Sequence, residues 1–244
     1  MGALISALHF LTTIPWLPHR PYSHKEMGRA VGIFPLVGLL IGAILVGVNY
    51  LLALIFPPSL VSALLLATWI ALTGALHLDG FLDACDGLLG GHDVESHLEI
   101  MRDERIGAFA FAGGAMLLLI KFIALDVTPE TTSALWLAPV MGRWGMSLAI
   151  AFFPYARKKG LGRGFKDYTT WRQVALSTII ALAVAILAAQ WLGLIVFGVT
   201  ALTVWLCARF VMKRIPGLTG DIYGAICEII EVVVLLALAV SLPL

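Results

Sequence analysis

The sequence predicts an all-α integral membrane protein, a polytopic bundle of about seven transmembrane helices with an additional N-terminal helix that is interfacial or re-entrant. Two observations support this fold class. Apolar residues make up 60% of the 244-residue chain and charged residues only 13%, whereas soluble domains carry about 25% charged residues. The apolar residues also gather in runs close to the ~20 residues that a helix needs to cross a bilayer.

The expected spans are separated by turn-forming segments such as Pro57-Pro58 and residues 126–133. They are residues 31–56, 60–78, 107–125, 134–153, 174–190, 191–207 and 224–243. Residues 174–207 are divided into two spans at Gln190, and this is the shortest break between neighbouring spans. Residues 1–17 lack the basic start and the small-residue cleavage site of a signal peptide, and we therefore expect them to form the interfacial or re-entrant helix.

The positions of the basic residues agree with this division. All but two of the 16 Lys and Arg residues lie before the first span or in the connections that follow the second, fourth and sixth spans. The positive-inside rule therefore predicts a multi-pass protein of the cell inner membrane, with its N-terminus and long connections in the cytoplasm. No repeat or linker divides the chain, so residues 1–244 are expected to form one domain. Membrane lipid is the expected environment, nucleic acid is not a suggested partner, and assembly into a homo-oligomer is left open.

An acidic motif begins where the second span reaches the cytoplasmic surface: His77-Leu-Asp-Gly-Phe-Leu-Asp-Ala-Cys-Asp-Gly87. Asp79, Asp83 and Asp86 are spaced i, i+4 and i+7, so they share one face of a helix. Like charges on one face repel one another, and a positive partner is expected. Mg²⁺ fits this role because it prefers oxygen ligands and completes its shell with water and substrate phosphates. The alternative is a solvated acidic helix end.

A second cytoplasmic helix is expected within residues 93–107, with Ser96 and Glu99 forming its capping box. Asp103 would share a face of this helix with Glu99, four residues before it. Asp103 is therefore a candidate fourth ligand for the metal. The acidic motif and this helix together would bring acids and bases to one place just outside the membrane.

Three arginines are candidates for binding substrate phosphate through their forked donors: Arg102, Arg105 and Arg143. Arg143 lies inside the fourth expected span, where charges are costly and are usually functional or paired. A structural ion pair with Glu228 or Glu231 is the competing interpretation. Lys121 also lies inside a span, and for this residue a structural partner and a role in the site are both open.

Two glycine-rich segments lie on the same expected face. Residues 156–166 mix glycine with basic residues, which suits anion binding through backbone N–H groups and side chains. Attraction to lipid headgroups is the alternative. Residues 217–224 form a second glycine-rich turn, with Asp221 at the mouth of the last span.

Several motifs together carry a resemblance to a known family. They are Phe34-Pro-Leu-Val-Gly-Leu-Leu-Ile-Gly42, the acidic motif at 77–87, Leu98-Glu-Ile-Met-Arg-Asp-Glu-Arg-Ile-Gly107, Gly142-Arg143, and Thr219-Gly-Asp221 followed by Glu228 and Glu231. On these residues most of the chain resembles the cobalamin synthase family, also called adenosylcobinamide-GDP ribazoletransferase. The chain departs from the family's pattern at Thr13, where Arg is usual, and near Ala110, where a glycine is usual. The aspartate core is intact.

The resemblance implies transfer of the cobinamide phosphate of adenosylcobinamide-GDP to α-ribazole or its 5′-phosphate, with release of GMP, in the last steps of cobalamin biosynthesis. It implies Mg²⁺ bridging the diphosphate, and the expected metal ligands are Asp79, Asp83, Asp86 and Asp103. Asp86 or Asp103 is expected to accept the proton of the attacking hydroxyl. The other residues expected to contact substrate, besides the three arginines, are His77, Gly80, Asp221 and Glu228.

Two other functions are weighed against this one. CDP-alcohol phosphotransferases of lipid synthesis also place aspartates at helix ends, but their Asp-Gly-x-x-Ala-Arg core would need an arginine where this chain has Cys85 and a further aspartate where it has Gly107. A metal-ion transporter would carry acids near the bilayer midplane. The aspartates of this chain are expected at the cytoplasmic rim instead.

Overall fold

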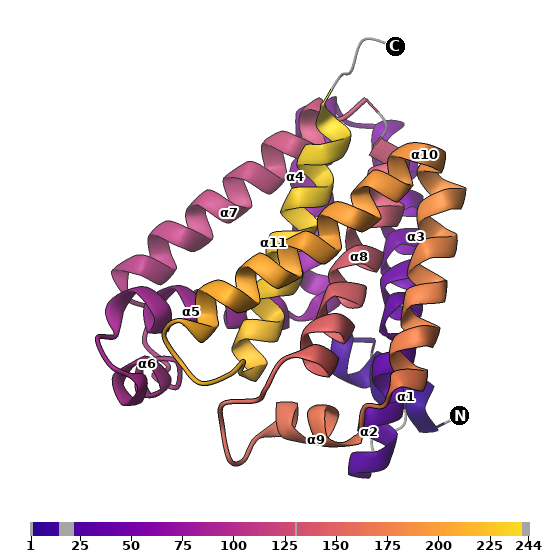
Figure 1. Ribbon diagram of the computed structural model, residues 1–244. Coiled ribbons are helices and arrows are strands. Elements are labelled where there is room, and N and C mark those ends of the chain that lie inside the picture. Colours follow the sequence, from indigo (N-terminus) through magenta and orange to yellow (C-terminus); the bar gives the residue numbers. More distant parts are fainter. Residues whose placement is uncertain (1, 15–21, 130, 241–244) are drawn as a thin grey trace.

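The computed structural model describes residues 2–14, 22–129 and 131–240, and its regular elements within these residues are helices. The expected all-α architecture is therefore confirmed (Figure 1). In chain order the elements are α1 (Gly2–Leu11), α2 (His24–Ala30), the 3-10 helix η1 (Val31–Ile33), α3 (Phe34–Ala53), α4 (Pro58–Thr73), α5 (Leu76–Gly90), α6 (Val94–Ile100), α7 (Ala108–Val127), α8 (Thr131–Phe152), α9 (Leu161–Tyr168), α10 (Trp171–Met212) and α11 (Gly220–Ala239).

Helix α8 lies at the centre of the bundle and packs against α3, α10 and α11. Two glycines of α3 allow its backbone to approach α8 closely. A Cβ atom at Gly38 would lie 2.5 Å from the backbone oxygen of Pro139, and one at Gly42 would lie 2.7 Å from that of Leu135. Small residues four positions apart are typical of helices packed in a membrane, where close contact replaces the hydrophobic driving force.

Five helical segments are long and apolar enough to cross a membrane: His24–Ala53, α7, α8, α10 and α11, and the bent pair α4 and α5 adds a sixth candidate. Helix α10 has two arms, because its backbone leaves the helical conformation at Ala189 and Gln190. The second arm returns across α11 (Figure 1). The seven segments predicted as spans fall on α3, α4, α7, α8, the two arms of α10, and α11, so the helices lie where the sequence predicts them.

The second predicted span, 60–78, ends earlier than expected. Gly74 and Ala75 both adopt the left-handed conformation, which terminates a helix. The chain then turns by 90° from α4 into α5. His77 and the aspartates therefore belong to a separate helix that is set at an angle to the span.

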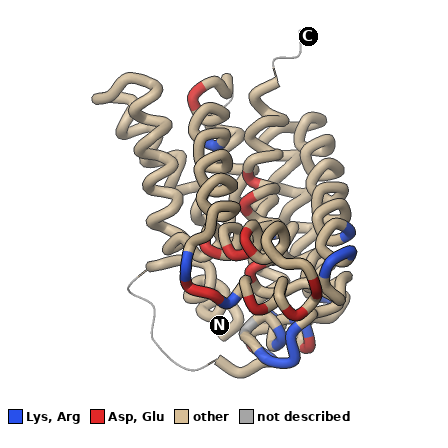
Figure 2. Tube along the Cα trace, turned by 90° about the vertical axis from the view of Figure 1, so that its left-hand side faces the viewer, with Lys and Arg blue, Asp and Glu red and all other residues tan. Residues whose placement is uncertain are grey.

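Lys and Arg residues gather mainly toward one end of the bundle, the end opposite the C-terminus (Figure 2). Helices α1, α2, α6 and α9 lie at this end (Figure 1). The two basic residues that the sequence leaves inside spans, Lys121 and Arg143, are both buried. Helix α1 corresponds to the expected N-terminal helix and packs against α2 and α3, whereas residues 15–17 of that expectation lie outside the described residues.

Candidate active site

Helix α5 carries the acidic motif and rests directly on the beginning of α11. A Cβ atom at Gly80 would lie 2.8 Å from the backbone oxygen of Asp221, and a Cβ atom at Gly224 would lie 3.1 Å from that of His77. Only glycine allows the two backbones to come so close at these positions. This contact brings Asp221 to the aspartates of α5, although more than 130 residues separate them in the chain.

Asp83 is half-buried at the centre of a group of charged side chains. It interacts electrostatically with three other carboxylates, which we call with Asp83 the aspartate cluster: Asp79, Asp86 and Asp221. One cation, Arg157, faces it, and the Nη2 atom of Arg157 lies 2.9 Å from Oδ2 of Asp221. Carboxylates this close together repel one another, and a bound cation or a proton relieves the repulsion.

The donor atoms of this cluster are the carboxylate oxygens that Mg²⁺ prefers, so their chemistry fits the expected metal. Among the described residues, no group of three or more His, Cys, Asp or Glu side chains lies at metal-ligand spacing. The residues therefore fit the metal by the type of their donor atoms and by the excess of carboxylates over cations that act on Asp83.

Asp86 caps the N-terminus of α7. Its Oδ2 accepts a hydrogen bond of 2.6 Å from the backbone N–H of Gly107, and its Oδ1 accepts one of 2.8 Å from that of Ala110. A carboxylate at this position satisfies free N–H groups and interacts favourably with the helix dipole. The sequence alone does not reveal this role, because the donors lie 21 and 24 residues further along the chain.

A cavity of about 200 Å³ opens between α5 and the segment that joins α6 to α7, and we call it the charged cavity. The charged side chains that line it are Asp79, Asp83, Asp86, Arg102, Asp103, Glu104 and Arg105. The four predicted metal ligands and two of the three predicted phosphate-binding arginines therefore share one space. Bases and acids do converge just outside α5, as expected.

The expected helix over 93–107 is shorter than predicted, and its predicted capping box is wrong. The helix, α6, ends at Ile100. Asp93 is its N-cap and accepts a 2.8 Å hydrogen bond from the backbone N–H of Ser96, whose hydroxyl in turn accepts one of 3.0 Å from the N–H of Asp93. Ser96 is thus the third residue of the helix, and Glu99 and Asp103 do not share a helical face, because Asp103 lies in the turn that follows.

Asp103 and Arg105 form a bidentate ion pair. The Nε atom of Arg105 lies 3.0 Å from Oδ1 of Asp103, and its Nη2 lies 2.7 Å from Oδ2. Hydrogen bonds from the side chain and the backbone N–H of Arg105 lower the pKa of Asp103 to about 2. In this arrangement Asp103 is a weak base, and it becomes a stronger one only when Arg105 turns away.

The intramembrane charges meet in one buried ion cluster. Lys121 Nζ lies 2.6 Å from Oε2 of Glu228 and 2.5 Å from Oε2 of Glu231, and Arg143 forms an ion pair with Glu231. His77 Nδ1 lies 3.3 Å from Nη2 of Arg143. Paired charges of this kind are the usual way to hold ions inside a membrane protein. Three predicted substrate contacts, His77, Arg143 and Glu228, therefore lie in this cluster and do not line the charged cavity.

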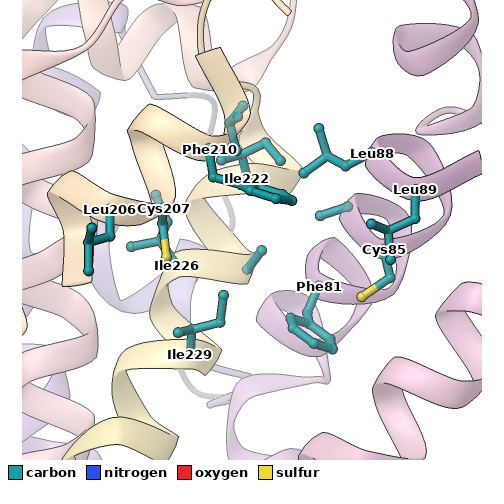
Figure 3. A pocket seen from close by; sticks show the side chains of 13 residues that line it. Phe81, Cys85, Leu88, Leu89, Leu206, Cys207, Phe210, Ile222, Ile226 and Ile229 are labelled. Carbon is teal, nitrogen blue, oxygen red and sulfur yellow. The ribbon is translucent and has the colours of Figure 1, made fainter. Parts of the chain in front are cut away.

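An apolar cavity of about 360 Å³ lies between α5, α10 and α11 (Figure 3). Phe81, Cys85 and Leu88 extend into it from α5 and face side chains of the other two helices (Figure 3). No charged side chain lines it in the part of the chain that the structure describes. This space offers contact area to apolar groups and supplies no partner for a phosphate or a metal.

A further cavity of about 250 Å³, which we call the Arg157 cavity, lies where the glycine-rich segment at 156–166 meets the beginning of α11. Arg157, Asp221 and Tyr223 are among its lining residues. Sequence reasoning missed Arg157 as an individual site residue. The signal that could have found it is the glycine-rich basic composition of its segment.

Comparison with known proteins gives one consistent result. The family model of CobS, cobalamin-5-phosphate synthase, matches residues 3–239. The chain is 39% identical to an adenosylcobinamide-GDP ribazoletransferase of Desulforamulus reducens over 94% of its own length and 93% of that relative, and 41% identical to one of Pseudomonas syringae pv. syringae over 96% and 97%. No solved structure matches. The chain therefore belongs to the cobalamin-5-phosphate synthase family.

Proposed function

We propose that this protein is a membrane-embedded adenosylcobinamide-GDP ribazoletransferase. It joins adenosylcobinamide-GDP to α-ribazole or α-ribazole 5′-phosphate and releases GMP, which yields adenosylcobalamin or its 5′-phosphate. Family membership over nearly the whole chain supports this function. The structural observation that carries it is the charged cavity, where carboxylates and arginines face the same space.

The reaction brings a ribose hydroxyl to a phosphorus atom that already bears negative oxygens, while charge develops on the departing GMP. The new bond joins the ribose oxygen to phosphorus, and the bond from phosphorus to the GMP oxygen breaks. Arg102 and Arg105 are placed on the wall of the charged cavity, where their guanidinium groups can grip the diphosphate and offset its charge. Such positioning and charge compensation provide most of the catalysis in phosphoryl transfer.

We assign Mg²⁺ as the cofactor, held by Asp79 and Asp83. When bound, it would neutralise the diphosphate and align it for attack. Asp83 supports this assignment because three other carboxylates, Asp79, Asp86 and Asp221, act on it electrostatically. Asp86 and Asp103 remain further candidate ligands, although Asp86 is hydrogen-bonded to the N-terminus of α7 and Asp103 is paired with Arg105.

Asp103 is our choice as acceptor of the hydroxyl proton. Both sequence candidates, Asp86 and Asp103, are hydrogen-bonded in ways that weaken them as bases. The bonds of Asp86 come from the backbone of α7 and stay in place. The partner of Asp103 is the exposed side chain of Arg105, so a phosphate that attracts Arg105 would release Asp103 and raise its proton affinity.

We further propose that the protein lies in the cell inner membrane with this site facing the cytoplasm. Arg102 and Arg105 directly follow α6, which lies at the end of the bundle opposite the C-terminus (Figure 1), where basic residues gather (Figure 2). Basic loops remain on the cytoplasmic side of bacterial membrane proteins.

The test is an assay of the purified protein in detergent or liposomes. With adenosylcobinamide-GDP, α-ribazole and Mg²⁺, we expect GMP and a cobalamin product to form in equal amounts. Omission of α-ribazole should stop GMP release, which distinguishes transfer from hydrolysis. A folded wild-type protein that forms neither product with both substrates and Mg²⁺ present would refute the proposed function.

A further inference from the structure

The Arg157 cavity contains polar groups that the protein itself leaves without hydrogen-bond partners. Tyr223 is only 3% exposed, and its hydroxyl has no partner among the described residues. The Nε atom of Arg157 is likewise buried without a hydrogen-bond partner in the described part of the chain. The Nη2 atom of Arg157 lies 2.9 Å from Oδ2 of Asp221 and forms an ion pair with it, so Nε is the donor that this pair leaves available. Buried donors left in this state require an explanation, and a ligand is one.

Two helix N-termini converge on the same cavity. Gly160 is the N-cap of α9 and lines the cavity, as does Gly220, the first residue of α11. The first turns of helices carry free N–H groups and the positive end of the helix dipole, and both attract anions. Neither glycine has a side chain to keep a ligand away from the backbone. The guanidinium of Arg157 offsets the carboxylate of Asp221, which lines the same cavity, and the two helix N-termini add partial positive charge that favours an anion.

The position of the cavity relates it to the proposed reaction. Asp221 lines the Arg157 cavity, whereas Asp79 and Asp83 line the charged cavity. Asp83 interacts electrostatically with both Asp221 and Asp79. Members of the aspartate cluster therefore line two different cavities, an arrangement that allows two substrates to approach the cluster from different directions.

We propose that the Arg157 cavity binds the acceptor substrate and holds it by a phosphate monoester. The inference rests on the proposed function, under which this ligand is α-ribazole 5′-phosphate and the charged cavity receives the diphosphate of the donor. Arg157 and the N-termini of α9 and α11 contact the phosphate, and the Tyr223 hydroxyl donates to a ligand oxygen. The matching family model bears the name cobalamin-5-phosphate synthase, which agrees with an acceptor that carries a phosphate.

The first experiment replaces Arg157 by Gln. Loss of one charge-assisted contact to phosphate should raise KM for α-ribazole 5′-phosphate by about 10-fold or more. KM for adenosylcobinamide-GDP should change less than about 2-fold. The ratio of kcat/KM for α-ribazole 5′-phosphate to kcat/KM for α-ribazole should fall by about 10-fold or more. Arg163→Gln is the matched control, because Arg163 lies on α9 but is exposed and paired with Asp167, and it should leave both KM values unchanged.

The second experiment replaces Tyr223 by Phe. If the hydroxyl has no ligand, its removal deletes an unsatisfied buried group and should leave KM unchanged while stability stays equal or rises. The proposal instead requires equal or higher thermal stability together with a KM for α-ribazole 5′-phosphate that rises by about 3-fold or more. An unchanged KM in this variant contradicts the assignment of the hydroxyl to the ligand.

A direct binding measurement distinguishes the acceptor substrate from other phosphate-containing ligands of the Arg157 cavity. Without donor, titration calorimetry of the detergent-solubilised protein should show α-ribazole 5′-phosphate binding more tightly than α-ribazole and inorganic phosphate, and Arg157→Gln should weaken it. Equal binding of both ribazoles by the wild type overturns the proposal. The proposal is also overturned if Arg157→Gln loses co-purified anionic phospholipid but binds α-ribazole 5′-phosphate as tightly as the wild type. The site would then hold a lipid headgroup. Release of GMP by the wild type supports the proposed function under each of these outcomes.

Discussion

The carboxylate of Asp86 accepts a hydrogen bond of 2.6 Å from the backbone N–H of Gly107, and this contact joins the aspartate helix α5 to the start of α7. A second bond, from Ala110, engages the other carboxylate oxygen. An acid that the sequence assigns to metal binding and proton transfer thus also has a structural role. Substitutions in the aspartate cluster separate the structural role from the catalytic one.

Replacement of Asp86 by Ala should destabilise the protein. The variant loses both hydrogen bonds and the favourable charge at the N-terminus of α7, which together are worth about 1–3 kcal/mol. Thermal unfolding in detergent should show a lower Tm than that of the wild type. Glu99→Ala, which removes an exposed acid of α6, is the control and should leave Tm unchanged; an unchanged Tm in Asp86→Ala would show that the cap contributes nothing.

Replacement of Asp83 by Asn should abolish turnover and leave the fold intact. The substitution keeps the size of the side chain but removes the charge at the centre of the aspartate cluster. We expect GMP release to fall by about 100-fold or more, as when a key electrostatic contact to a transition state is lost. Tm should stay equal or rise, since repulsion among the acids decreases. Glu95→Gln on the exposed face of α6 should keep full activity, and near-normal turnover of Asp83→Asn would refute the metal assignment.

Removal of divalent metal should stop the reaction reversibly. Chelation should suppress GMP release, and added Mg²⁺ should restore it, because the diphosphate and the aspartate cluster repel each other without a cation. In Asp79→Asn the Mg²⁺ concentration for half-maximal activity should rise by about 10-fold or more, since one carboxylate ligand is lost. Full activity in chelator, or an Mg²⁺ requirement that Asp79→Asn does not change, would contradict a metal held at this position.

The buried ion cluster allows a test of whether its residues bind substrate. Lys121→Met leaves Glu228 and Glu231 buried with Arg143 as the remaining cation of the cluster among the described residues, and breaking such a pair costs about 3–5 kcal/mol. The double variant Lys121→Met/Glu228→Gln removes one charge of each sign and should recover most of the lost stability. Thermal unfolding of the three proteins provides the measurement.

Activity of the same double variant separates the two interpretations of the cluster. If its residues have a structural role, GMP release should recover together with Tm. If Glu228 contacts substrate, as the sequence analysis predicts, the double variant should be stable and inactive. The comparison with wild type uses identical detergent and substrate concentrations.

The contact between α5 and α11 should tolerate no side chain at Gly80. A Cβ atom there would lie 2.8 Å from the backbone oxygen of Asp221, and the helices would have to separate. We expect Gly80→Ala to lower both Tm and GMP release. Gly47→Ala is the matched control, because Gly47 lies in α3 and a Cβ atom there would meet no neighbouring element of the described chain within 4 Å; this variant should be neutral or more stable by about 0.5–1 kcal/mol. Equal behaviour of the two variants would contradict the role of the close contact.

Much of the fold follows from local sequence signals. Hydropathy predicts the spans, and the broken backbone at Gln190 divides α10 close to where the sequence analysis divides it. The early end of α4 at Gly74 and Ala75 was missed, because the apolar run continues through the turn and hydropathy does not report backbone conformation. The capping box at Ser96 was misassigned because Asp93 also fits the N-cap position and is followed by Ser96 at the third helical position.

The sequence by itself determined that this chain enters a membrane, which end carries the basic residues, and that Asp79, Asp83 and Asp86 share one helical face. These properties depend on composition and on a helical period of about 3.6 residues, and both are local. Only the tertiary structure decided that Asp221 and Arg157 join the aspartates and that Lys121 and Arg143 neutralise Glu228 and Glu231. These pairings join residues that lie far apart in the chain, and they form only when close helix packing, at positions such as Gly80, fixes which faces meet.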